Sequence, residues 1–262
     1  NRYLGGLVGA LSWRNGSVQL SKNKVETTIK NTKTEGSVGS RLGGVVGVYT
    51  GLGGGEDAVA DFTINENDVA VDISSSDTAL AVGGIVGYAL VNATNSTFAI
   101  RNSTVKPVNP GKNPNVITAT ASKMYNVHAA YVVGRVDNPN YTVELRGNHA
   151  EGNIKIAAST VKAMSGVGAM AGIAYCLNLY VRYNTSIGDL SVPIANETAG
   201  TDSDFFHVGY EVGEIRAPSS AQMNVEDNYH YGFSDENAGL AVGWLGLVNG
   251  DPVTPDLWKT QA

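Results

Sequence analysis

The sequence predicts an all-β protein, a parallel β-helix (β-solenoid) of about six to seven coils with a repeat near 40 residues. The motif LGGVVG at residues 42–47 occurs nearly verbatim as LGGLVG at 4–9 and as VGGIVG at 82–87. An Asn follows each motif at a similar distance, inside an extended segment. Glycine is abundant at 32 residues and charged residues make up only 16%, a composition that favours close-packed strands joined by tight turns.

The Gly-rich openings recur along the whole chain, where they read LGGLVG, LGGVVG, VGGIVG, HAAYVVG, GVGAMAG, HVGYEVG and AVGWLG. A fixed period of this length is typical of solenoids and propellers. In the fourth unit, Ala129 and Ala130 are expected to replace the glycine pair. We expect a single repeat domain over 1–262, with units near 3–40, 41–80, 81–126, 127–164, 165–204, 205–239 and 240–262.

Each unit is expected to contain three extended segments. The first is the Gly-rich opening, as in LGGLVGALSW, and the second alternates apolar and polar residues, as in TVELR at 142–146. The third follows the Asn, as in VAVDI at 69–73. Helical periodicity is weak everywhere, so no helix is predicted.

The recurring Asn residues predict a ladder along one turn of the solenoid. Equivalent turns of a parallel β-helix stack about 4.8 Å apart, so an Asn side chain there can hydrogen-bond to the coils above and below. Asn also tolerates the left-handed backbone conformation that such turns use. The predicted ladder consists of Asn23, Asn67, Asn102, Asn148, Asn184 and Asn228.

The openings GGLVG, GGVVG and GGIVG, each followed by an Asn-bearing strand, resemble the GLUG-type repeats of large secreted and surface-attached proteins. The resemblance is closest in the first three units and weakens after them. It implies a right-handed β-helix in an adhesin-like surface scaffold, and it carries over no catalytic residue.

Composition and charge exclude several classes of protein. The net charge is −6 and no Lys/Arg cluster exceeds a pair, which argues against a nucleic-acid binder. No apolar run reaches the length of a membrane span. The lone cysteine, Cys176, lies in the apolar run AGIAYCLNLYV and is expected to be a small buried hydrophobe without a disulfide partner.

Asn-x-Ser/Thr triplets are frequent, which indicates a glycoprotein if the chain passes through a eukaryotic secretory pathway. The alternative is that Asn, Ser and Thr share turns for structural reasons. The candidate N-glycosylation sites are Asn15, Asn92, Asn95, Asn140 and Asn196.

The strongest candidate for local chemistry is a polar cluster that could contact glycans. Paired carboxylates can act on glycosidic bonds, but here they can equally form an exposed strand face. Histidines are scattered without metal-ligand spacing, and the Gly-rich stretch at 51–57 lacks the Lys-Ser/Thr ending of a phosphate loop. No catalytic residue, metal or cofactor is therefore predicted. The candidate glycan-contact cluster consists of Asp202, Asp204, His207, Glu211 and Glu214.

The sequence thus predicts a non-enzymatic structural or adhesive scaffold, secreted or displayed on the cell surface. The repeat begins at Tyr3, so its first coil needs a cover. That cover is expected to be either neighbouring repeats of a longer chain or a second copy, stacked end to end into a filament or surface layer. The alternative function is a carbohydrate-binding or polysaccharide-degrading β-helix protein.

Overall fold

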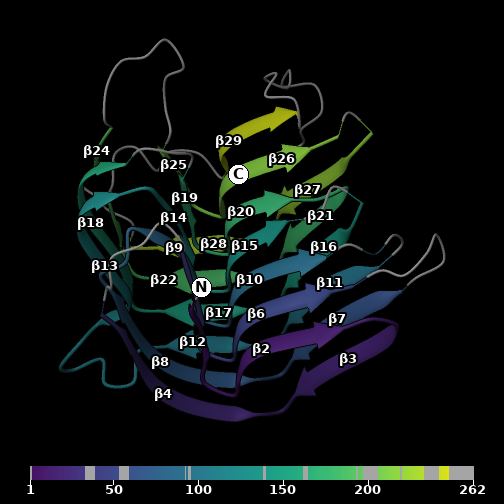
Figure 1. Ribbon diagram of the computed structural model, residues 1–262, viewed down its shortest axis with the longest axis horizontal. Coiled ribbons are helices and arrows are strands. Elements are labelled where there is room, and N and C mark those ends of the chain that lie inside the picture. The colour runs from purple at the N-terminus through teal and green to yellow at the C-terminus, as the bar shows by residue number, and fades with distance from the viewer. Residues whose placement is uncertain are drawn as a thin grey trace.

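The computed structural model confirms an all-β, parallel β-solenoid and has no helix in the residues it describes (Figure 1). Equivalent residues of successive coils are hydrogen-bonded neighbours, as in the pairs Leu42↔Val82 and Phe98↔Val143. About five turns are complete, slightly fewer than expected, and a partial turn follows them. The described residues are 2–32, 39–52, 59–91, 93, 96–137, 140–161, 165–192, 194–196, 206–218, 220–232 and 242–247.

Each coil contributes to four stacked sheets, which we name A to D in chain order. Sheet A contains β1 (Arg2–Gly5), β5 (Ser40–Gly43), β9 (Ala79–Gly83), β14 (Asn126–Ala130), β19 (Ser165–Gly168) and β25 (Phe206–Gly209). Sheet B contains β2 (Val8–Trp13), β6 (Val46–Gly51), β10 (Val86–Val91), β15 (Val133–Asp137), β20 (Ala171–Tyr175), β26 (Val212–Ala217) and β29 (Val242–Leu247).

Sheets C and D complete the coil. Sheet C contains β3 (Gly16–Ser21), β7 (Ala60–Asn65), β11 (Thr97–Arg101), β16 (Thr142–Arg146), β21 (Asn178–Arg182) and β27 (Gln222–Glu226). Sheet D contains β4 (Lys24–Asn31), β8 (Asp68–Ser75), β12 (Thr104–Lys106), β13 (Asn115–Met124), β17 (His149–Glu151), β18 (Asn153–Val161), β22 (Thr185–Ile187), β23 (Leu190–Ser191), β24 (Ile194–Asn196) and β28 (Tyr229–Tyr231).

The expectation of three extended segments per unit is wrong, because the Gly-rich opening bends into two strands. The bend falls at the glycine pair, so the strand before it joins sheet A and the strand after it joins sheet B. The last glycine of the opening is kept in every coil. A Cβ at Gly87 would lie 2.6 Å from the backbone N and O of Leu42, so sheets A and B approach too closely for a side chain. This glycine column consists of Gly9, Gly47, Gly87, Gly134, Gly172, Gly213 and Gly243.

The prediction that Ala129 and Ala130 replace the glycine pair in the fourth unit is wrong by one residue. Sheet register pairs Ala130 with Gly83, so Ala130 and Tyr131 replace the glycine pair. Gly84 is the residue of the third coil that is equivalent to Tyr131, and a Cβ at Gly84 would lie only 2.6 Å from Val105 Cγ1 across the interior. Where Tyr131 takes this place, the sheet D residue in register with Val105 is the smaller Ala150. A change of volume on one wall is therefore offset on the other.

The interior is apolar and well packed. The Tyr49 and Phe62 rings stack with centroids 4.3 Å apart, and Phe98 follows Phe62 at 5.8 Å. The buried hydroxyls of Tyr49 and Tyr141 both donate to the carbonyl of Ala60, at 3.0 and 2.7 Å. The polar ends of the aromatic rings are thus satisfied inside the core.

A polar ladder runs along the corner between sheets C and D. The Asn148 backbone N–H donates to Asn184 Oδ1 at 2.9 Å, and the Asn148 side-chain amide donates to the carbonyl of Ile100 at 2.9 Å. The same pattern joins Asn23 to Asn67 and Asn184 to Asn228. The residues of the ladder are Asn23, Asn67, Ser103, Asn148, Asn184 and Asn228.

The prediction that Asn102 belongs to this ladder is wrong, because Ser103 takes the third place. Ser103 accepts from the Asn67 backbone N–H at 3.2 Å, and its own N–H donates to Asn148 Oδ1 at 3.1 Å. Asn102 instead has a φ of 51° and occupies the left-handed position directly before the ladder. The other residues with positive φ at this position are Lys22, Glu66, Gly147, Tyr183 and Asp227. The ladder Asn residues therefore do not carry the left-handed turn conformation expected of them.

Candidate functional site

The predicted glycan-contact cluster does not form a single site. Asp202 and Asp204 lie outside the described residues. His207 and Glu214 come together, with His207 Nδ1 3.3 Å from Glu214 Oε2. Glu211 is separated from them because it follows the bend between β25 and β26 and occupies an interior position. The same position in earlier coils holds the buried apolar residues Val45, Ile85, Val132 and Met170.

Glu211 belongs to a polar chain inside the sixth coil. Its carboxylate forms a short ion pair with Nε2 of His230, and His230 Nδ1 lies 2.6 Å from Ser186 Oγ. The Tyr210 ring stacks on His230 with centroids 5.5 Å apart. Burial raises the pKa of Glu211 from 4.5 to about 7, although the hydrogen bond and the charge of His230 oppose this rise.

The order serine, histidine and carboxylate is that of a nucleophile activated by a base. Ser186, however, is 0% exposed, so no substrate can reach its hydroxyl. We interpret this chain as a buried polar cluster, which stands where earlier coils hold apolar side chains.

The raised pKa of Glu211 predicts that stability depends on pH. The folded pKa exceeds the unfolded one, so the stabilisation is fully present below pH 4.5 and is lost as pH rises through about 7. A shift of this size corresponds to about 3 kcal/mol. Urea unfolding at pH 5 and pH 8 should show wild type losing more stability than Glu211→Gln, which stays neutral. Equal losses in both proteins would contradict the assignment.

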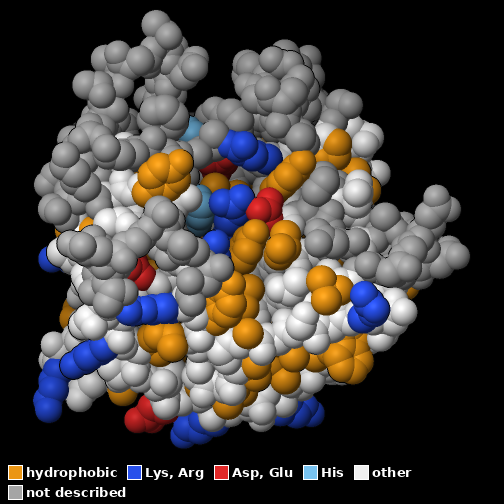
Figure 2. All heavy atoms as spheres, viewed as in Figure 1, with side chains coloured by type: hydrophobic (Ala, Val, Ile, Leu, Met, Phe, Trp, Pro, Cys, Tyr) orange, Lys and Arg blue, Asp and Glu red, His pale blue; other side chains and the backbone are white. Residues whose placement is uncertain are grey.

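Charged side chains also line the outer face where sheets A and B meet, which we call the A–B cleft. Figure 2, viewed as Figure 1, shows Lys/Arg, Asp/Glu and His side chains gathered in a hollow on this side of the molecule. Sheet register and contacts assign to the cleft Arg41, Tyr88, His128, Arg135, Asp137, His207, Glu214 and Arg216.

The cleft contains two ion-paired groups. In the lower group, Asp137 accepts from Arg135 at 2.7 Å and from the Tyr88 hydroxyl at 2.9 Å. Burial raises the pKa of Tyr88 to about 12, so this hydroxyl remains a donor. In the upper group, Glu214 accepts from Arg216 Nε at 2.5 Å and contacts His207. Glu214 is fully buried, and its charge is compensated by these partners.

The sequence contains a periodic signal for this cleft. Arg41, His128 and His207 each stand two residues before the small residue that ends a sheet A strand. Equivalent positions in a solenoid lie in one column, so these side chains belong to one face.

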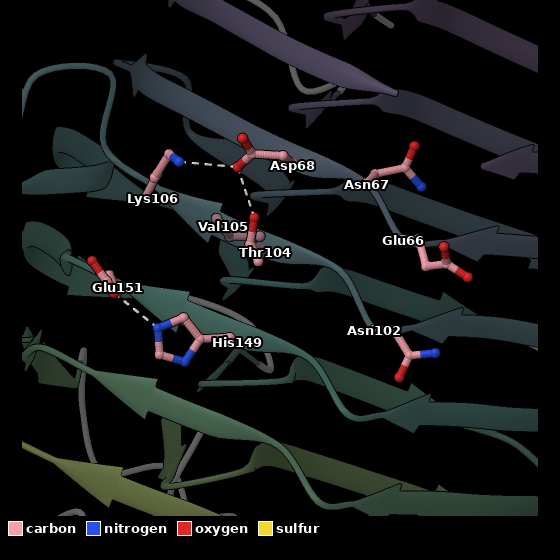
Figure 3. A pocket seen from close by; sticks show the side chains of 9 residues that line it. All are labelled: Glu66, Asn67, Asp68, Asn102, Thr104, Val105, Lys106, His149 and Glu151. Carbon is pink, nitrogen blue, oxygen red and sulfur yellow. Dashed lines mark hydrogen bonds and ion pairs between the residues drawn. The ribbon is translucent and has the colours of Figure 1, made fainter. Parts of the chain in front are cut away.

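A second site lies over sheet D and is shown in Figure 3. This pocket has a volume of about 450 Å³. Four of its ionic groups form two pairs, since Asp68 contacts Lys106 at 3.0 Å and His149 contacts Glu151 at 2.8 Å, and Glu66 contacts Lys22 at 3.7 Å. Hydrogen bonds from Thr104 and Lys106 hold the pKa of Asp68 below its usual value. The lining residues are Glu66, Asn67, Asp68, Asn102, Thr104, Val105, Lys106, His149 and Glu151.

The remaining predicted residues lie apart from both sites. Cys176 is fully buried, and burial raises its pKa. Of the candidate glycosylation sites, Asn15 and Asn140 are exposed, whereas Asn92 and Asn95 lie outside the described residues. Asn196 is the last residue of β24.

No group of three His, Cys, Asp or Glu residues that could hold a metal ion occurs in the described part of the chain. None of the described segments is a helix long and apolar enough to cross a membrane. No protein-family model, curated protein or solved structure matches the chain.

Proposed function

We propose that the protein is a non-enzymatic structural or adhesive scaffold at the cell surface or outside the cell, of the kind built from GLUG-type repeats. The observation that carries this proposal is the open first coil. Leu4 is 37% and Leu7 47% exposed, whereas the residues stacked on them, Leu42 and Val45, are fully buried. In the part of the chain that the structure describes, this interior column is therefore exposed at the first coil.

The backbone of the first coil supports the same conclusion. Among the strands that the structure describes, β1 to β4 each pair with the second coil alone. Their other edge presents free N–H and C=O groups beside apolar side chains, which is a template for another strand layer. The occupant that fits this surface is a further coil of the same repeat, which in a solution of this chain means a second copy stacked end to end.

If the protein self-associates through its first coil, its apparent molecular mass in solution should rise with protein concentration. Analytical ultracentrifugation of wild type is expected to show dimers or longer assemblies that dissociate on dilution. The double variant Leu4→Lys/Leu7→Lys should be monomeric, because it places two charges in the uncovered column. Tyr125→Lys is a matched control, since it replaces a 57% exposed aromatic between β13 and β14, away from the first coil. A monomer at every wild-type concentration would contradict end-to-end stacking.

A second candidate function, carbohydrate binding, is favoured by a different observation. The A–B cleft gathers partly exposed arginine, tyrosine and aspartate side chains in a hollow (Figure 2), and polar groups of these kinds can orient a bound ligand. Incubation with a polysaccharide panel separates binding from degradation. We expect no new reducing ends, and turnover that Asp137→Asn abolishes would reassign the protein as an enzyme.

A further inference from the structure

We propose that the outer face of sheet D binds a neutral saccharide chain, which stacks on Tyr229 and Tyr231 and extends into the pocket of Figure 3. This inference rests on the carbohydrate-binding candidate and gives it a second surface, separate from the A–B cleft. It does not depend on self-association, which involves the first coil. The three ideas can therefore fail separately.

Two columns of outward-pointing side chains make up this face, which we call the sheet D face. The first column, from β8 to β28, consists of Asp68, Thr104, His149, Thr185 and Tyr229. The second consists of Glu151, Ile187 and Tyr231. Four inter-strand steps of about 4.8 Å make the first column about 19 Å long, which is room for several sugar rings in a row.

Side chains of the sheet D face are open to solvent along its length. At the upper coils, Tyr229 is 72% and Tyr231 77% exposed. At the lower coils, the side chains of the two ion pairs in the pocket are between 39% and 54% exposed. Figure 3 shows the pocket side chains rising from neighbouring strands, with Thr104 and Lys106 on one and His149 and Glu151 on the next. A ligand can therefore reach both ends of the face.

The two tyrosines form an aromatic platform. They are two residues apart on β28, so their side chains leave the strand on the same side, about 7 Å from each other. Ile187, which is 40% exposed, lies in register with Tyr231 and widens the apolar surface. Tyr183 at the neighbouring corner is not part of the platform, because two arginine guanidinium groups lie 5.2 and 5.9 Å from its ring centre. A tyrosine offers an apolar ring face and a polar hydroxyl, which match the C–H faces and the hydroxyl rim of a pyranose.

The charges of the pocket favour a neutral ligand. Each ionisable side chain that lines the pocket has a partner, in the pairs Asp68–Lys106, His149–Glu151 and Glu66–Lys22. A charged ligand would have to displace one of these pairs. Hydroxyl groups can instead donate to the carboxylate lone pairs that the ion pairs leave free, and they can bond to the exposed Asn102 amide. The pocket volume of about 450 Å³ is typical of a small-molecule site.

Other classes of ligand fit this face less well. An extended peptide usually adds to a free sheet edge, whereas β12, β17 and β22 each have a neighbouring strand on both sides. A dense polyanion is opposed by the net charge of −6. A neutral chain with many hydroxyl groups remains the best match.

Affinity electrophoresis through gels that contain neutral glucan, mannan or xylan tests the platform. Wild type should be retarded by at least one of these polysaccharides. The double variant Tyr229→Ala/Tyr231→Ala should lose affinity at least about tenfold, because two stacking contacts are removed. Tyr229→Phe/Tyr231→Phe should keep most of the affinity, since both ring faces remain. Tyr125→Ala is the matched control, because it removes a 57% exposed aromatic outside both columns.

A charged polysaccharide tests the pocket. Wild type should bind ionised polygalacturonate more weakly than the preferred neutral chain. Asp68→Asn leaves the Lys106 charge without its ion pair, so this variant should gain affinity for polygalacturonate by about two- to fivefold.

Several results would overturn the proposal. They are the absence of binding to all three neutral polysaccharides, equal retardation of wild type and the double alanine variant, and equal or tighter binding of polygalacturonate by wild type. An unchanged affinity of Asp68→Asn for polygalacturonate would refute the charge argument. A double alanine variant that changes sedimentation instead of retardation would make the platform a protein contact. Circular dichroism melting of each variant shows that lost affinity is not lost folding, and binding that depends on Asp137 alone would place the ligand in the A–B cleft.

Discussion

Replacing Gly87 with alanine is expected to lower the free energy of unfolding by about 3 kcal/mol, the upper end for overpacked cores. The added Cβ would lie 2.6 Å from the backbone O of Gly47 and from the N and O of Leu42. Backbone atoms held in two sheets cannot rotate away as a side chain can, so the strands themselves must separate. Urea unfolding followed by circular dichroism measures the loss.

The chain provides a matched control for this substitution. Alanine at Gly111, in the loop between β12 and β13, would meet only Asn109 Oδ1, at 3.8 Å. Gly111→Ala should therefore change stability by less than about 0.5 kcal/mol, as surface substitutions usually do. Similar losses in the two variants would show that the close approach of sheets A and B does not require glycine.

The second large effect is expected from Asn148→Ala in the polar ladder. Asn148 is buried, accepts from the Ser103 N–H, and donates to the Ile100 carbonyl and to Asn184 Oδ1. Its removal leaves several buried polar groups without partners, and each costs about 1–3 kcal/mol. We expect a total loss of about 3 kcal/mol or more, measured by chemical denaturation.

Asn109→Ala removes the same side chain from an exposed loop position and serves as the control. Its stability should stay close to that of wild type. If Asn148→Ala unfolds at the same urea concentration as this control, then the ladder hydrogen bonds contribute nothing net. Water would in that case replace them at no cost.

The fold was largely predictable from the sequence because its two landmarks have direct physical causes. The last glycine of each opening marks a close approach of two backbones, and the Asn marks a hydrogen-bonded corner. The third ladder position was misassigned because a serine hydroxyl can play the same role as an amide. In the segment RNST at 101–104, Asn102 and Ser103 are both candidates for the ladder position. The strand register shows that Ser103 occupies it.

The site was less predictable, because neighbours in sequence point to different sides of a coil. Glu211 and Glu214 are three residues apart, but Glu211 enters the interior and Glu214 joins the outer cleft. Conversely, Arg41 and Tyr88 come from different coils and meet through their sheets. Such contacts can be predicted only if the repeats are aligned without error. The alignment of the fourth unit was wrong by one residue at Ala130, and such an error assigns side chains to the wrong side of the coil.

The parallel register also has a kinetic consequence. Every rung joins residues of neighbouring coils, as when Asn148 bonds Asn184, 36 positions further along the chain, and Asn23 bonds Asn67, 44 positions further. The first pair of coils must therefore close long loops before any ladder bond forms, and this entropic cost slows nucleation. Each later coil adds to an edge that is already ordered. Folding should thus proceed by templated growth after a slow start, with the exposed edge of the growing stack as its aggregation-prone stage.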